Sequence, residues 1–136
     1  VCSGNTCRSP MAEAILKAEL KKRKVKEYSV TSAGLRVMQG ATLSPMSATV
    51  SAENGYPISE RFRPKRLTPK AKENAFLIIA MTDDLRDRVG TKNAYSIREL
   101  SGYDIPDPYG KTIEYYKCAF DLLRLAMPEI LKKLAI

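Results

Sequence analysis

The chain has 136 residues, of which 44% are hydrophobic and 28% charged. This length suits a single domain over residues 1–136 and is too short for two. No apolar run approaches the roughly 20 residues that span a bilayer, and no secretory signal is visible, so we expect a cytoplasmic protein with no membrane partner. Three cysteines are an odd number. They favour thiol chemistry over a disulfide framework.

Positive charge dominates, with 23 lysines and arginines against 15 aspartates and glutamates, a formal net charge of +8. Much of it lies in two runs, residues 21–26 and residues 61–72. We interpret the first run as a solvated helix end, since charge runs are usually surface features. We interpret the second as a rim that steers anionic substrates toward a pocket.

Three predicted helices begin with the same signal, a hydroxyl residue followed by proline, which suits the N-cap and N1 positions. The first signal predicts a helix over residues 10–23, the second a helix that ends before Gly55, and the third a short helix. The three pairs are Ser9-Pro10, Ser44-Pro45 and Thr68-Pro69.

Strand candidates alternate with these helices. Residues 28–32 are rich in β-formers, residues 76–81 are continuously apolar, and residues 94–97 are a weaker candidate. A further strand, the first of the chain, should lead into Cys2. We expect that a few of its apolar residues are missing before Val1, so that this strand is truncated.

Two more helices complete the pattern. Thr82 can cap a helix that runs to Val89 and stops at Gly90, and residues 112–135 should be helical, with a kink or split at Pro128. The alternation predicts an α/β fold, a three-layer sandwich with a four-stranded parallel sheet flanked by helices. Ligands of such folds bind at the carboxyl ends of the strands.

A cysteine loop joins the first strand to the first helix, with Arg8 placed six residues after Cys2. Backbone amides between a strand end and a helix start can converge on one anion. Gly4 and Asn5 tolerate the left-handed conformations that a tight loop needs. The predicted phosphate-binding residues are Ser3, Gly4, Asn5, Thr6, Cys7, Arg8 and Ser9.

The residue types in this loop indicate phosphoryl chemistry. Amide dipoles and Arg8 would stabilise Cys2 as a nucleophilic thiolate. Arg8 offers a planar fork to two phosphate oxygens. Ser9 would cap the helix and donate a hydrogen bond to the departing thiolate.

The run from residue 1 to residue 13 resembles the signature of the low-molecular-weight protein tyrosine phosphatase family. The likeness continues at residues 32–34, 80–81 and 107–109, and so spans essentially the whole chain. The resemblance implies a phosphocysteine intermediate, no metal and no cofactor. It also implies that Ser9 and Ser32 support the loop by hydrogen bonding with Asn5. Family members frequently have a supporting histidine near Phe62, whereas this chain has no histidine.

Asp107 is the predicted general acid, because expelling the leaving group needs a proton donor and no histidine is present. It lies in a proline-rich loop before the last helix, and it matches the Asp-Pro pair of the family. Asp104 is the alternative. Met38 and Tyr109 are predicted to form walls of the pocket.

The other two cysteines lie in the loop and in the last helix. Cys7 could form a reversible disulfide with Cys2 or simply pack beneath the loop, and both interpretations stay open. We expect Cys118, in the last helix, to belong to the core, since free cysteine is usually buried.

Thr6 bears on the substrate, because tyrosine phosphatases of the family usually have a bulky aliphatic residue at its position. The family's bacterial protein arginine phosphatases resemble this chain in having threonine there. The expected substrates are therefore phosphorylated proteins, with phosphoarginine slightly favoured over phosphotyrosine. We expect a monomer.

Two alternative functions remain. Thioredoxin-coupled arsenate reductases share the fold and a similar loop, but they use a further cysteine pair near the third strand, and residues 76–95 contain none. A non-catalytic phosphate- or RNA-binding module would not need a cysteine, an arginine and an aspartate together. It would also show basic and aromatic residues interleaved, so we expect no nucleic acid partner.

Overall fold

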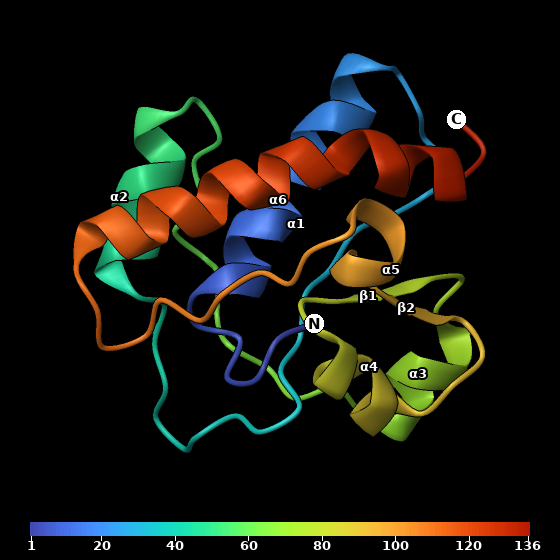
Figure 1. Ribbon diagram of the computed structural model, residues 1–136, viewed down its shortest axis with the longest axis horizontal. Helices are drawn as coiled ribbons and strands as arrows, with labels where there is room; N and C mark the ends of the chain where they lie inside the picture. The colour runs from blue at the N-terminus through green and yellow to red at the C-terminus, as the bar shows by residue number, and fades with distance from the viewer.

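The computed structural model describes the whole chain, residues 1–136 (Figure 1). Two regular strands are present, β1 (Ile78–Ala80) and β2 (Ala94–Ser96), and they pair in parallel. The helices are α1 (Arg8–Lys22), α2 (Pro45–Glu53), α3 (Pro69–Asn74), α4 (Asp83–Val89), α5 (Ile97–Ser101) and α6 (Ile113–Lys133).

The backbone around Cys2 extends this sheet without forming a regular strand. The carbonyl of Val1 accepts a hydrogen bond from the amide of Met81 at 3.1 Å, beside β1. On the other side, Gly34 makes parallel bridges to Cys2 and to Arg66. The cysteine therefore lies at the carboxyl end of a short central segment of the sheet, where ligands of parallel sheets bind.

The α/β class with a parallel sheet is confirmed, but two of the four expected strands are not regular. Residues 28–32 form no strand. The segment that contains them pairs with Cys2 through a single bridge, at Gly34, and one bridge does not make a strand ladder. The two strands that do form are shorter than residues 76–81 and 94–97, and Ile97 already opens α5.

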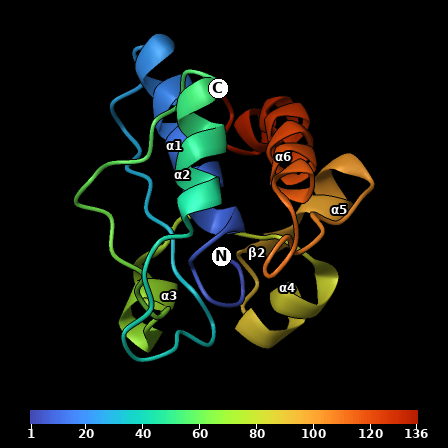
Figure 2. The ribbon, with the colours of Figure 1, turned by 90° about the vertical axis from the view of Figure 1, so that its left-hand side faces the viewer.

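Helices cover both faces of this small sheet. In Figures 1 and 2, α1, α2 and α6 lie above it, and α3 and α4 lie below. The helices α1 and α2 both pack on α6, and α4 packs on both strands. The main core cluster joins the layers, and its largest fully buried side chains are Phe120, Met11, Ile15 and Met81. This arrangement is the expected three-layer sandwich.

Two of the predicted helix starts are confirmed in full. Thr68 caps α3 by accepting from the amide of Ala71, and Thr82 caps α4 by accepting from the amide of Leu85. Gly90 ends α4 in the left-handed region, at φ 70. Each signal is local, so the chain needs no distant partner to form it.

The predicted capping role of Ser9 is wrong. The helix α1 already begins at Arg8, with Cys7 at the N-cap position and no capping side chain. The Ser9 hydroxyl lies 2.9 Å from the sulfur of Cys2, and this contact replaces the capping bond. Ser44 does occupy the N-cap of α2, but its side chain makes no capping bond either.

The structure excludes a split of the last helix and a core position for Cys118. The helix α6 is one element with Pro128 inside it, and it is not split. Both Pro128 and Arg124 are exposed, so water can solvate the Arg124 carbonyl that the proline leaves without a helical donor. Cys118 is exposed on this helix and does not belong to the core.

No helix in the protein combines the length and apolar character needed to cross a bilayer.

Candidate active site

Cys2 is buried at the centre of the loop, with 3% of its surface exposed. Its sulfur accepts a hydrogen bond from the amide of Asn5 at 3.3 Å and lies 2.9 Å from the hydroxyl oxygen of Ser9. Asn5 adopts the expected left-handed conformation, at φ 57, whereas Gly4 does not. The left-handed turn at Asn5 brings its amide back toward the sulfur.

Most other amides of the loop have no acceptor within the protein. The Cys2 amide donates to the carbonyl of Ala33, and among residues 3–7 only the amide of Asn5 is engaged; the first amide of α1 is also free. A helix start and successive unpaired N–H groups form a site that favours an anion. The unpaired amides belong to Ser3, Gly4, Thr6, Cys7 and Arg8.

A network of side chains holds the loop and determines where each proton points. The amide of Lys65 donates to Asn5 Oδ1 at 2.9 Å, so the other end of the Asn5 side chain must be the NH₂ group. That group donates to the Ser9 hydroxyl oxygen at 2.8 Å and to the Ser32 hydroxyl oxygen at 3.0 Å. The predicted loop support by Ser9 and Ser32 has this geometric basis.

The network ends in a carboxylate. Ser32 donates its own hydrogen to Glu13 Oε1 at 2.7 Å. Ser9 accepts from Asn5, so its hydrogen remains free to point at the sulfur of Cys2. In a chain without histidine, the Glu13 carboxylate and the Lys65 amide brace the loop.

Arg8 lies beneath the same loop, with 4% of its surface exposed. Its Nη1 donates to the carbonyl of Ile105 at 2.8 Å, and its Nη2 lies 3.6 Å from Asp107 Oδ2. The Nε atom is buried without a partner. The guanidinium is therefore held through Nη1, and its Nε hydrogen stays available to an oxyanion.

Asp107 lies in the loop between α5 and α6, which passes close to the cysteine loop in Figure 1. Its side chain is 52% exposed, and its Oδ1 accepts a hydrogen bond from the amide of Tyr109 at 3.1 Å. Asp104, the alternative acid, is paired instead with Arg98 at 3.0 Å. The hydrogen bond from Arg98 lowers the pKa of Asp104, so this carboxyl is ionised at neutral pH and holds no proton to donate.

The two predicted pocket walls lie at the outside of the site. Met38 is 69% exposed and Tyr109 is 74% exposed. Tyr109 follows Asp107 in the same loop, and Met38 follows the segment that bridges to Cys2. Their exposure leaves both side chains free to contact a substrate, and their role as walls stays a prediction.

Cys7 is buried behind the loop and is a free thiol, as are the other two cysteines. Its sulfur lies 3.5 Å from the hydroxyl of Tyr116 on α6, and its carbonyl accepts a hydrogen bond from Ser47 on α2 at 3.1 Å. Burial raises the pKa of the Tyr116 hydroxyl. Sequence reasoning assigned no role to these partners or to Glu13, although Glu13 lies one turn after Ser9 on the same helix.

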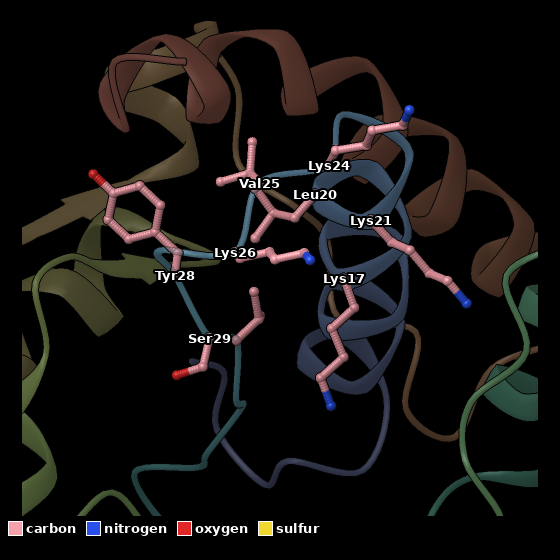
Figure 3. Close-up of a pocket in the computed structure, with 9 residues that line it drawn as sticks. Lys17, Leu20, Lys21, Lys24, Val25, Lys26, Tyr28 and Ser29 are labelled. Atoms are coloured by element: carbon pink, nitrogen blue, oxygen red, sulfur yellow. The ribbon is translucent and has the colours of Figure 1, made fainter.

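A separate groove of about 830 Å³ lies away from this loop (Figure 3). It is formed by the second half of α1 and the segment that follows, with lysines around an apolar floor. None of the predicted site residues lines it. The lining residues are Lys17, Leu20, Lys21, Lys24, Val25, Lys26, Tyr28, Ser29 and Val30.

A thiol that can attack, held beside a loop that can bind an anion, is the arrangement of the cysteine-dependent phosphatases. The chain belongs to the low molecular weight phosphotyrosine protein phosphatase family, whose model matches residues 1–135. No group of three or more histidine, cysteine, aspartate or glutamate side chains is arranged to hold a metal ion.

The relatives of the chain carry the names of two kinds of phosphatase. The chain is 32% identical over 130 residues to the probable low molecular weight protein-tyrosine-phosphatase EpsP of Ralstonia nicotianae, covering 91% of this chain and 86% of that protein. It is also 32% identical over 143 residues to the protein-arginine-phosphatase of Bacillus subtilis, covering 98% and 93%.

A solved structure agrees with this assignment. The YwlE arginine phosphatase, as a Cys-to-Ser mutant with a phosphorylated active-site serine, has a TM-score of 0.85 and 29% identity, covering 98% of this chain and 92% of that one. The protein is therefore a phosphatase that uses a cysteine.

Proposed function

We propose that the enzyme hydrolyses phosphorylated side chains of proteins, with phosphoarginine preferred to phosphotyrosine, and that Cys2 becomes phosphorylated during turnover. One observation carries the catalytic part. The sulfur of Cys2 lies 2.9 Å from the Ser9 hydroxyl inside a loop of unpaired amides. Such a loop can hold the three non-bridging oxygens of a phosphoryl group while the sulfur faces the phosphorus.

In the first step, the Cys2 thiolate attacks phosphorus and forms an S–P bond. The bond from phosphorus to the leaving oxygen or nitrogen breaks, and Asp107 gives its proton to that atom. Arg8, whose Nη2 lies 3.6 Å from Asp107, binds the phosphoryl oxygens.

In the second step, water attacks the phosphorus of phosphocysteine and the S–P bond breaks. The Asp107 carboxylate takes a proton from that water, and inorganic phosphate leaves. Cys2 departs as a thiolate, and the Ser9 hydroxyl, which has its hydrogen free, donates to it. The loop is then ready for another substrate.

Thr6 supports the preference for phosphoarginine. Its carbonyl accepts a hydrogen bond from the amide of Ser44 at 2.9 Å, and its hydroxyl oxygen lies 3.6 Å from the sulfur of Cys7. The side chain is therefore held beside the anion site and is only half-buried. A hydroxyl there can hydrogen-bond with the guanidino group of phosphoarginine, whereas a phenyl ring offers it no partner.

The nucleophile is tested by a pair of cysteine variants. Cys2→Ser should abolish turnover of an aryl phosphate while binding of inorganic phosphate, measured by calorimetry, persists. Cys118→Ser is the matched control, because this thiol is exposed on α6 and should leave activity unchanged. Equal activity of Cys2→Ser and the wild type would end the assignment of Cys2.

Selectivity is tested by kcat/KM on matched phosphoarginine and phosphotyrosine peptides. In the wild type the ratio should favour phosphoarginine, and Thr6→Ile should reduce that ratio about 10- to 100-fold, the worth of one hydrogen bond to a charged group. A wild type that favours phosphotyrosine would make that residue the substrate. An unchanged ratio in Thr6→Ile would remove Thr6 as the selecting residue.

A further inference from the structure

Two basic segments are attached to the cysteine loop by their backbones. The amide of Arg36 donates to the carbonyl of Ser3 at 2.8 Å, and the amide of Lys65 donates to Asn5 Oδ1 at 2.9 Å. Arg66 pairs with Gly34, which in turn bridges to Cys2. In Figures 1 and 2, the segment that contains Arg36 lies beside the cysteine loop. The backbone positions of these three residues are therefore set by the same bonds that shape the anion site.

The three side chains of Arg36, Lys65 and Arg66, here called the cationic rim, are exposed and have no partner of opposite charge. Residues 34–46 and 61–72 contain no acidic residue that could neutralise them. Nearby Arg63 differs, because its guanidinium turns back onto the carbonyls of residues 60 and 62.

Arginines near α4 and α5 show the contrasting arrangement. Arg86 is paired with Glu99 at 2.8 Å, and Arg98 is paired with Asp104 at 3.0 Å. Those charges are balanced within the protein. The positive charge of the cationic rim is not balanced, so it remains available to a bound partner.

We infer that the cationic rim selects phosphoproteins with aspartate or glutamate close to the phosphorylated residue. The inference rests on the proposed function and names its substrate class. The phosphoryl group itself is held by the loop amides and by buried Arg8, so the exposed rim is free to contact flanking side chains. Each exposed ion pair should raise kcat/KM by about 1.5- to 5-fold.

Each member of the rim can be tested alone. Lys65 and Arg66 are consecutive residues of an extended segment, and such residues project to opposite sides. One of them should therefore face the substrate more than the other, and single variants will show which. Lys65→Gln keeps the backbone amide that braces Asn5, because that bond does not use the side chain.

The experiment compares two peptides that share the phosphorylated residue and differ by glutamate or glutamine at three flanking positions. We expect the wild-type kcat/KM ratio of the glutamate to the glutamine peptide to exceed about fivefold at low salt. The ratio should fall toward one in 1 M salt, where the screening length drops from about 30 Å at 10 mM to about 3 Å. It should also fall toward one when Arg36→Gln, Lys65→Gln and Arg66→Gln are combined.

The matched control is Lys21→Gln, which removes the same charge from an exposed lysine of α1 that lines the separate groove. This variant should keep the wild-type ratio. A wild-type ratio near one, or a ratio that survives in the triple variant, would overturn the inference. Turnover of an aryl phosphate separates the two proposals: its absence in the wild type defeats the proposed function, whereas its presence with a ratio near one defeats the rim alone.

Discussion

The sulfur of Cys2 and the hydroxyl oxygen of Ser9 lie 2.9 Å apart, seven residues apart in the chain. Ser9 accepts a hydrogen bond from Asn5 at 2.8 Å, which leaves its hydroxyl hydrogen for the sulfur. A donor fixed beside a thiolate contributes most when that thiolate is the leaving group. The contact therefore predicts which step of turnover depends on Ser9.

Ser9→Ala should lower kcat about 10- to 100-fold, because a hydrogen bond to a charged group is worth about 1.5–3 kcal/mol. The loss should fall on hydrolysis of phosphocysteine, so rapid mixing with an aryl phosphate should reveal a burst of phenol release. Ser101→Ala is the control, since the Ser101 hydroxyl is buried without a partner. A Ser9→Ala enzyme with wild-type kcat would contradict this role.

Asp107→Asn should reduce kcat/KM by about 10²- to 10⁴-fold for aryl phosphates with poor leaving groups, and much less for those with good ones. A positioned acid matters only where the departing oxygen needs a proton. The measurement is the slope of log kcat/KM against leaving-group pKa. Asp121→Asn, at an exposed position of α6, should keep the wild-type slope. A uniform loss across the series would assign Asp107 a structural role.

Gly34→Ala should destabilise the fold by about 1–3 kcal/mol and also lower activity. An added Cβ would lie 2.7 Å from the carbonyl oxygen of Ser3 and 2.8 Å from Cγ2 of Val37, which would push the cysteine loop out of place. Urea unfolding and kcat/KM report the two effects. Gly55→Ala is the comparison: its Cβ would meet open space at φ 83, so stability should fall without loss of activity. Full activity in Gly34→Ala would show that the loop tolerates the displacement.

Glu99→Gln should weaken the fold more at neutral pH than at pH 3. The hydrogen bond from Arg86 lowers the pKa of Glu99 below its ordinary value of 4.5. The folded state therefore favours the carboxylate, so this stabilisation is present above pH 4.5 and is lost as the pH falls through the folded pKa. Urea midpoints at the two pH values measure the difference. Glu73→Gln, exposed on α3 and outside any ion pair, should show no such pH dependence, and an equal effect of both variants would refute the assignment.

The helical periodicity of α6 predicts the exposure of Cys118 correctly. The buried side of α6 includes Tyr116, Phe120, Leu123 and Met127, which recur at helical spacing. Cys118 falls off that stripe, so its exposure follows from the pattern, whereas the general tendency of cysteine to be buried was misleading. The capping error at Ser9 is of another kind, because only the folded structure shows that its hydroxyl contacts Cys2.

The sequence alone determined the chemistry of the loop, the α/β class and the starts of α3 and α4, because each depends on residue types at short spacing. Only the tertiary structure decided what braces that chemistry. The Lys65 amide reaches Asn5 from 60 positions away, and the Ile105 carbonyl holds Arg8 across 97 positions. Every residue except proline has such a backbone donor and every residue has such an acceptor, so residue types do not reveal which one the fold will bring to the site.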